Sequence, residues 1–264
     1  MKYFFSFVFL IVSFNISSQI IYPGEKQPLK TIKTDIVPEG ADKFWGAEDL
    51  YLKVFSGVSD IRYGKEYISY YFKSKSTPLL NNGRKFQSTL FFSGRRYDNV
   101  TLQYDTFLDE VIYPDSSILI NYQFPKIILN KSLVESFILN SGNKAMLFRN
   151  LKFTGNTGAC LQDGYYEIVY DGITKAIIKH KSVEYNYQAV NEYKYKPEIY
   201  LNPGAKYIRI KNNKDLIKAL GRNPAEVKIF LEKAGIKIKN TSYYRIAEVL
   251  KYYDSLITSD NASK

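Results

Sequence analysis

Short runs of β-branched and aromatic residues alternate with turn-forming residues through the middle of the chain. Four such runs lie between residues 84 and 123, at 86–92, 97–104, 108–113 and 117–122. Ser-Gly, Asp-Thr and Pro-Asp dipeptides separate them, and this spacing is typical of antiparallel strands joined by tight turns. The stretch therefore predicts the centre of an antiparallel sheet.

The same pattern continues on both sides of this stretch. Further strands are expected at 67–72, 126–129, 133–139, 145–153, 165–170, 173–181, 183–195, 200–201 and 206–211. Asp171 and Gly172 stand between two of these strands and favour a two-residue type I′ turn, because both residues tolerate a positive φ. Tyrosine alternates with polar residues over 183–195, which predicts a strand with one solvated face.

The spacing of apolar residues becomes helical near residue 212. A first helix is expected over 213–220, with Asn213 as its cap and Gly221 as its stop. A second helix follows an Asn-Pro dipeptide in which Asn223 is the expected cap, and it ends at Gly235. These two helices predict a small helical region after the strands.

A third helix is expected to open at Thr241 or Ser242. Its apolar face consists of Ile246, Val249, Leu250, Tyr253 and Ile257. The sequence thus predicts an α+β protein, with a mainly antiparallel β-sheet domain followed by a small C-terminal three-helix subdomain. The expected divisions are a signal peptide (1–18), an extended lead-in or linker (19–43), the β domain (44–211), the basic helical subdomain (212–258) and a disordered tail (259–264).

The first residues have the three parts of a secretory signal peptide. Lys2 supplies a positive charge, residues 4–14 are apolar except for two serines, and Ile-Ser-Ser before Gln19 fits a cleavage site. The apolar run is shorter than the roughly 20 residues needed to span a bilayer. We therefore expect an exported mature chain with no transmembrane segment, located in the periplasm, at the outer membrane or outside the cell.

The composition limits the chemistry that the chain can perform. A hydrophobic content of 45% with 24% charged residues fits a globular protein, and 24 Tyr and 17 Phe favour half-buried sheet surfaces. Cys160 is the only cysteine, which excludes an internal disulfide. His180 is the only histidine, so a multi-histidine zinc site is not expected, and we expect this residue to be partly exposed on a strand. No metal and no cofactor are expected.

Positive charge is concentrated at the C-terminal end. Residues 205–264 hold 13 Lys and Arg against 6 Asp and Glu, a balance of +7 out of +11 for the chain. Ten of these residues are candidates for contact with an anionic surface: Lys206, Arg209, Lys211, Lys214, Lys218, Arg222, Lys228, Lys233, Lys237 and Lys239. The alternative is an ordinary solvated lysine-rich face. Since export separates the chain from nucleic acid, the expected partner is an envelope protein or an anionic envelope polymer.

Two stretches carry motifs that we recognise together. The first contains Thr77-Pro-Leu-Leu-Asn, Gly94-Arg-Arg-Tyr-Asp-Asn-Val-Thr-Leu-Gln-Tyr-Asp and Asp109-Glu-Val, and the second contains Tyr200-Leu-Asn, Asn213-Lys-Asp-Leu and Tyr252-Tyr-Asp-Ser-Leu. They cover about a third of the chain and resemble a family of exported, functionally uncharacterised proteins of Gram-negative bacteria. The resemblance implies export and a β domain with a lysine-rich helical tail, and it brings no activity.

Catalytic motifs such as Gly-x-Ser-x-Gly, a phosphate loop, His-Glu-x-x-His or a calcium loop do not occur in the sequence. We therefore expect a non-catalytic binding or structural component of the cell envelope or extracellular space, with exposed tyrosine and lysine faces. One alternative is a hydrolase that uses paired carboxylates from Asp105, Asp109, Glu110 and Asp115, although such acids more often stabilise turns. The other is polyanion binding, to lipopolysaccharide or an acidic glycan, by the basic helices.

Overall fold

The computed structural model describes residues 60–62, 64–70, 74–117, 124–142, 144–153, 161–187, 190–239 and 243–262. All of them belong to residues 48–264, one of the two units into which the chain divides. The predicted signal peptide, the linker and Cys160 lie outside the described residues.

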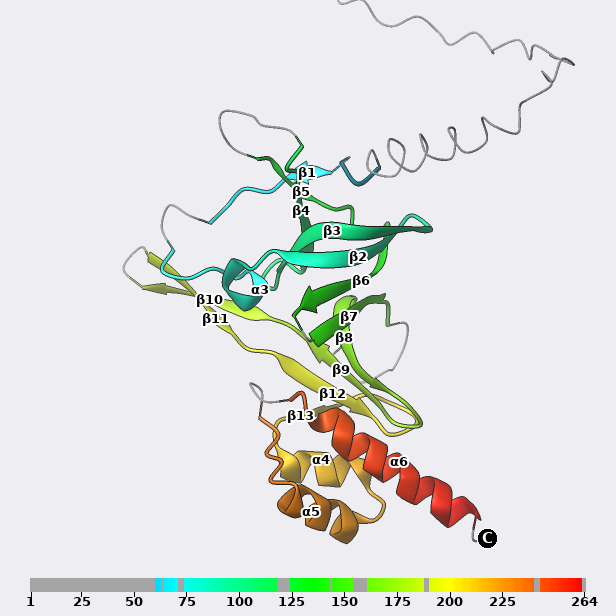
Figure 1. Ribbon diagram of the computed structural model, residues 1–264. Helices are drawn as coiled ribbons and strands as arrows, with labels where there is room; N and C mark the ends of the chain where they lie inside the picture. Colours follow the sequence, from blue (N-terminus) through cyan, green and yellow to red (C-terminus); the bar gives the residue numbers. More distant parts are fainter. Residues whose placement is uncertain are drawn as a thin grey trace, which may run out of the picture. The chain divides into compact units, whose positions relative to one another are not determined.

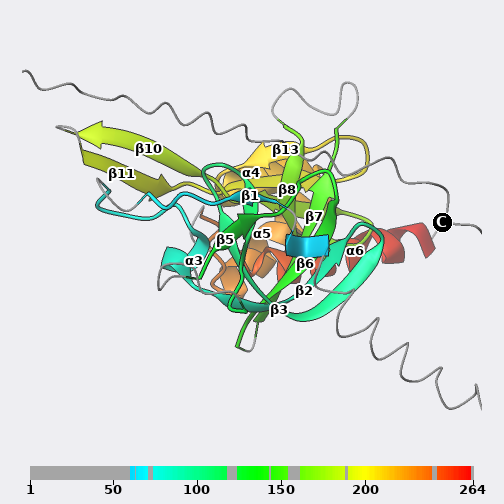
Figure 2. The same cartoon turned by 90° about the horizontal axis from the view of Figure 1, so that it is seen from above.

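Eleven of the described strands form one antiparallel sheet (Figure 1), in the order β1-β5-β4-β3-β2-β6-β7-β8-β9-β12-β13. Their bounds are β1 (Lys65–Glu66), β2 (Phe86–Phe92), β3 (Arg95–Asp105), β4 (Glu110–Pro114), β5 (Lys126–Ile128), β6 (Val134–Ser141), β7 (Lys144–Leu151), β8 (Gly164–Asp171), β9 (Lys175–Lys179), β12 (Glu198–Asn202) and β13 (Ile208–Ile210). A separate antiparallel hairpin consists of β10 (Ser182–Tyr187) and β11 (Val190–Tyr195), and it projects beside the main sheet in Figure 2. The predicted α+β class with a mainly antiparallel sheet is confirmed.

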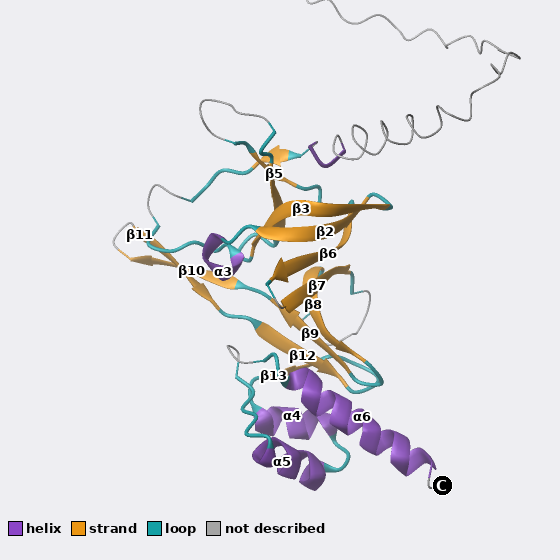
Figure 3. Ribbon diagram, viewed as in Figure 1, coloured by secondary structure: helices purple, strands orange, loops and turns teal. Residues whose placement is uncertain are grey.

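The helices of the described part lie mostly at the C-terminal end, next to β13 (Figure 3). Their bounds are a 3-10 turn (Asp60–Arg62), α3 (Leu80–Gly83), α4 (Asn213–Leu220), α5 (Pro224–Lys233) and α6 (Ile246–Ala262). No helix among the described residues is both long and apolar enough to cross a membrane.

The first core is built by strands β2, β3, β6, β7 and β8. Alternate residues of β2 are buried, as a strand with one face on the core requires. At the centre of this core the rings of Phe137 and Phe148 stack with centroids 4.7 Å apart, and Tyr104 and Tyr165 meet them edge-on or tilted. These aromatic contacts account for much of the high Tyr and Phe content.

A second core joins the helices to the end of the sheet. Ile178 of β9 and Ile199 of β12 are fully buried in it together with Leu216, Val227 and Val249 of the three helices. The helices therefore share a hydrophobic core with β9, β12 and β13 and do not enclose one of their own. Neighbouring residues of a strand point to opposite faces of the sheet. The face of β9 and β12 that points away from the helices therefore carries a different set of side chains.

Three strand predictions were wrong in detail. Residues 67–70 form no strand, and Tyr67 instead packs on the sheet as a buried residue. The turn after β8 holds three residues, 172–174, because Asp171 pairs with Lys175, so it is not a two-residue type I′ turn. The predicted single strand at 183–195 is the β10–β11 hairpin, which reverses between residues 187 and 190.

Three helix-end predictions were also wrong. Asn212, not Asn213, caps α4 by accepting a hydrogen bond from the Asp215 amide. Asn223 precedes α5 with a φ of 47° and its side chain makes no capping hydrogen bond. The third helix, α6, is described from Ile246 and runs to Ala262, into the predicted disordered tail, while Thr241 and Ser242 lie outside the described residues.

His180 was predicted to be partly exposed on a strand, and this prediction was wrong. It follows the last residue of β9 and is 1% exposed. Its Nε2 lies 2.8 Å from Glu167 Oε2 and its Nδ1 lies 2.5 Å from the Tyr195 hydroxyl. Burial of this ring is possible because both of its nitrogens have partners.

Candidate functional site

All ten basic residues singled out in the sequence are exposed in the structure. Arg209 forms an ion pair with Glu198 at 2.9 Å, and Lys228 approaches Glu232 at 4.0 Å. Within the described residues, the other eight form no ion pair. They spread from the β12–β13 connection over the helical subdomain, and three of them come together around one groove.

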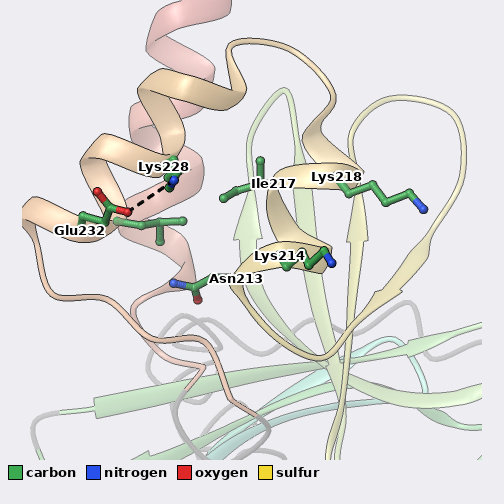
Figure 4. Close-up of a pocket in the computed structure, with 7 residues that line it drawn as sticks. Asn213, Lys214, Ile217, Lys218, Lys228 and Glu232 are labelled. Atoms are coloured by element: carbon green, nitrogen blue, oxygen red, sulfur yellow. Dashed lines mark ion pairs between the residues drawn. The ribbon is translucent and has the colours of Figure 1, made fainter.

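This groove lies between α4 and α5 and has a volume of about 580 Å³. Figure 4 shows the side chains that line it: Asn213, Lys214, Ile217, Lys218, Lys228, Leu231 and Glu232. We call it the α4–α5 groove. Its size lies within the range of about 300 to 1,000 Å³ that small-molecule sites occupy.

The local sequence explains how the groove is held open. Gly221 has a φ of 73° and ends α4, which turns the chain back so that α5 packs beside α4. The Asn213 side chain donates to the Ile236 carbonyl and accepts from the Ile238 amide, both at 2.7 Å, which ties the start of α4 to the segment after α5. The two helices therefore have a defined separation.

The groove is apolar inside and positive at its rim. Ile217 and Leu231 supply apolar surface from facing helices. Lys214 and Lys218 are four residues apart on α4 and so lie on one side, while Lys228 comes from α5. Three lysines and one acid, Glu232, line the groove, and lysine stems extend apolar surface while their charges stay in water. This arrangement suits a ligand with an apolar part and an anionic part.

Comparisons with known proteins add no family to this picture. No protein-family model, curated protein or solved structure matches the chain. The resemblance stated from the sequence therefore stays a prediction, and function has to be argued from the groove and from the residues around it. No group of three or more metal-ligating residues occurs in the part of the chain that the structure describes.

The acids of the hydrolase alternative occupy different environments. Asp105 is fully buried and accepts hydrogen bonds from the amides of Phe107 and Leu108 and from the Tyr67 hydroxyl. Both Asp105 and the equally buried Asp115 therefore stabilise turns, since Asp115 accepts from the backbone and side chain of Ser117. Turn stabilisation is the role expected from the sequence as the alternative to catalysis for these two acids.

Glu110 and Asp109 are partly accessible. Burial, followed by the nearby Asp105 carboxylate, raises the pKa of Glu110. Asp109 accepts from the Tyr104 hydroxyl at 2.5 Å and pairs with Lys131 at 2.5 Å and Lys179 at 2.8 Å. A carboxylate held by two lysines and a phenol is fixed in position, and it lies on a second, smaller pocket described below.

Gly164 makes room for this Asp109 network. Its φ is 147°, and a Cβ built on it would overlap Asp109 Oδ2 and lie 2.6 Å from Lys179 Nζ. We expect Gly164→Ala to lower the free energy of unfolding by about 2 kcal/mol, because the methyl group strains the backbone and displaces both charges. Urea unfolding measures this effect.

The matched control for that experiment is Gly204→Ala. Gly204 has a φ of 150°, and a Cβ built on it would have no neighbour within 4 Å. It therefore carries the backbone cost without the displacement of charges. Equal losses of stability for the two variants would contradict the argument about Asp109.

The sequence found the basic residues of the groove but missed its other lining residues. Ile217 and Leu231 belong to apolar stripes whose helical spacing was recognised only as core-forming. The cluster of Glu167, His180 and Tyr195 was not predicted either, because these residues come from β8, from the segment after β9 and from β11. Spacing along the chain carries no signal for which side chains meet across elements.

Proposed function

We propose that this protein is an exported, non-catalytic binding component of the cell envelope that holds a phosphate-bearing lipid in its α4–α5 groove. The observation that carries the proposal is the combination of an apolar groove with three lysines and one acid at its rim. An acyl chain would contact Ile217 and Leu231, and the phosphate would lie among the lysine ammonium groups. This joins the two sequence hypotheses of envelope binding and polyanion binding in one site.

A lipid fits this groove better than a purely polar polymer does. Polar saccharide would leave the apolar floor without a matching surface, whereas an acyl chain gains about 25 cal/mol for each Å² that it removes from water. The positive rim favours an anionic head group over a neutral one. Exported location, which the first 18 residues suggest, would bring the groove to envelope lipids.

The exposed tyrosine face on which the binding hypothesis partly rested is not supported. Of the tyrosines whose burial the structure describes, only Tyr195 and Tyr244 are exposed. Binding is therefore proposed for the lysines and the groove. No observation specifically favours the hydrolase alternative, since the carboxylates of Asp105 and Asp115 accept hydrogen bonds from amides of their own turns.

Vesicle co-sedimentation tests the proposal with the mature full-length chain. We expect binding to vesicles of phosphatidylglycerol and phosphatidylcholine and weak binding to phosphatidylcholine alone. The triple variant Lys214→Gln, Lys218→Gln, Lys228→Gln should lose about 100-fold in affinity, from about 1 kcal/mol for each lysine near an anionic surface. Binding should weaken as salt rises, since salt screens exposed charges.

The control removes the same charge outside the groove. Lys233, Lys237 and Lys239 are exposed on the same subdomain and do not line the groove. Their triple glutamine variant should lose less than about threefold in affinity. Equal losses in the two triple variants would show a diffuse charge effect and overturn the groove. Binding to an acidic envelope protein with no binding to either vesicle would overturn lipid as the occupant.

A further inference from the structure

A second pocket lies on the sheet face that the helices leave open. Its volume is about 290 Å³, at the small end of ligand pockets. It is bordered by the β3–β4 turn, Lys131, the start of β8, the end of β9 and the start of β12. Tyr166 and Tyr200 belong to the core cluster of this face together with Ile177, whereas the next residue, Ile178, faces the helices. We call it the Lys179 pocket.

Charges of both signs line the Lys179 pocket. They are three lysines and three acids: Lys131, Lys179, Lys181, Asp109, Asp163 and Glu198. The acids already have partners. Asp163 accepts from the Phe153 amide at 2.8 Å, and Glu198 accepts from the Tyr200 hydroxyl at 2.7 Å and pairs with Arg209. The lining lysines and acids balance in number, but Lys131 and Lys179 share Asp109, and Lys181 forms no ion pair among the described residues, so its ammonium group is available to a ligand anion.

Lys179 is held at a defined position. Lys179 is 13% exposed in its side chain, pairs with Asp109, donates to the Tyr165 carbonyl at 3.2 Å and lies 4.8 Å from the centre of the Tyr166 ring. Burial lowers the pKa of Lys179, the Asp109 carboxylate counters this, and the neighbouring Lys131 and Lys181 lower it further. An additional anion would relieve the repulsion among these three ammonium groups.

We propose that the Lys179 pocket binds a small hydroxylated carboxylate, a monomeric sugar acid, with its carboxylate at Lys131, Lys179 and Lys181. The lining is mostly charged side chains, phenols and an amide, which an apolar ligand would shield from water without offering any hydrogen bond in return. Hydroxyl groups satisfy such a lining, because they donate to carboxylates and accept from ammonium groups. This site is separate from the α4–α5 groove and does not depend on the function proposed there.

Isothermal titration calorimetry with galacturonate, galactose and acetate tests this proposal on the full-length mature chain. We expect galacturonate to bind at least about tenfold more tightly than either galactose or acetate, since only galacturonate offers both the charge and the hydroxyl groups. The variant Lys181→Gln should weaken galacturonate binding about tenfold. Lys181 is exposed and forms no ion pair among the described residues, so this variant should fold as the wild type does.

Two further variants make the result decisive. Lys131→Gln should also weaken galacturonate binding about tenfold, because it removes the second ammonium group. Lys175→Gln is the matched control. Lys175 is exposed on β9, the strand that carries Lys179, but it pairs with Asp171 outside the pocket. Equal affinity for galacturonate and galactose, or equal weakening in the control, would overturn the proposal. The triple lysine variant of the α4–α5 groove should bind galacturonate as the wild type does, so the galacturonate result does not depend on the outcome of the lipid experiment.

Discussion

The protein is expected to unfold cooperatively as the pH rises from about 10 to about 12, because its buried tyrosines cannot ionise in the folded state. Six of the described tyrosines are at most 2% exposed: Tyr104, Tyr165, Tyr166, Tyr200, Tyr243 and Tyr253. Burial is the largest cause that raises the pKa of each, and it brings the pKa of Tyr166 to about 12. Unfolded phenols ionise near pH 10.

The sign and size of the effect follow from proton binding. Above pH 10 the folded chain keeps phenol protons that the unfolded chain has lost, so the free energy of unfolding falls as the pH rises. Each buried tyrosine contributes about 1.4 kcal/mol for every pH unit, or about 8 kcal/mol for six. This is comparable with the whole stability of a typical domain, about 5 to 15 kcal/mol. Burial lowers the pKa of Lys126, Lys144 and Lys179, which act in the opposite sense, but these are three groups against six buried tyrosines.

Circular dichroism and phenolate absorbance, followed together against pH, measure this transition. We expect most phenolate absorbance to appear with the loss of structure. Tyr165→Phe should move the midpoint to higher pH, because within the described residues the Tyr165 hydroxyl is buried without a hydrogen-bond partner. Tyr252→Phe, which removes a phenol on a partly exposed residue of α6, should leave the midpoint unchanged. Complete ionisation near pH 10 with the sheet intact would contradict the prediction.

Asp254→Ala is expected to lower the free energy of unfolding by about 3 kcal/mol, because it leaves buried donors without an acceptor. Asp254 lies on α6 and is 7% exposed. Its carboxylate accepts from the Thr174 amide at 3.2 Å, from the Thr174 hydroxyl at 2.9 Å and from the Tyr170 hydroxyl at 2.9 Å. This single side chain connects the last helix to the turn between β8 and β9.

Urea unfolding of two further variants completes this test. Asp254→Asn keeps one acceptor oxygen and should lose less stability than Asp254→Ala. Glu248→Ala is the control on the same helix, since Glu248 is exposed and pairs only at the surface with Arg245. It should cost less than about 1 kcal/mol. Equal destabilisation by Asp254→Ala and Glu248→Ala would show that the connection to the β8–β9 turn contributes nothing.

The turn that Asp254 holds shows where sequence reasoning stopped. Asp171 and Gly172 predict a two-residue turn from local preference alone. In the structure Thr174 is also part of the turn, because a carboxylate 80 residues away binds its amide and hydroxyl. A Cβ on Gly172 would lie 2.5 Å from Asp254 Oδ2, so this glycine is needed for the close approach of α6. A long-range contact overrides the local preference here.

His180 gives the same lesson for a candidate functional residue. Its alternation with Lys179 and Lys181 predicts partial exposure, and only the arrival of Glu167 and Tyr195 at its two nitrogens makes its burial possible. Asp109 resembles it, since its two lysine partners come from a turn and from a strand remote in the sequence. Which acids are structural and which face a pocket could not be read from the chain.

Local patterns in the sequence were enough to predict the antiparallel strands, the helices after residue 212 and the exposure of the basic residues, because periodicity and charge act over a few neighbouring residues. The Lys179 pocket and the α4–α5 groove are visible only in the folded chain. The pocket combines side chains from turns and strands that lie far apart in the sequence, and the groove depends on how the two neighbouring helices pack. Strand order and helix packing depend on these long-range contacts, and no local pattern records them.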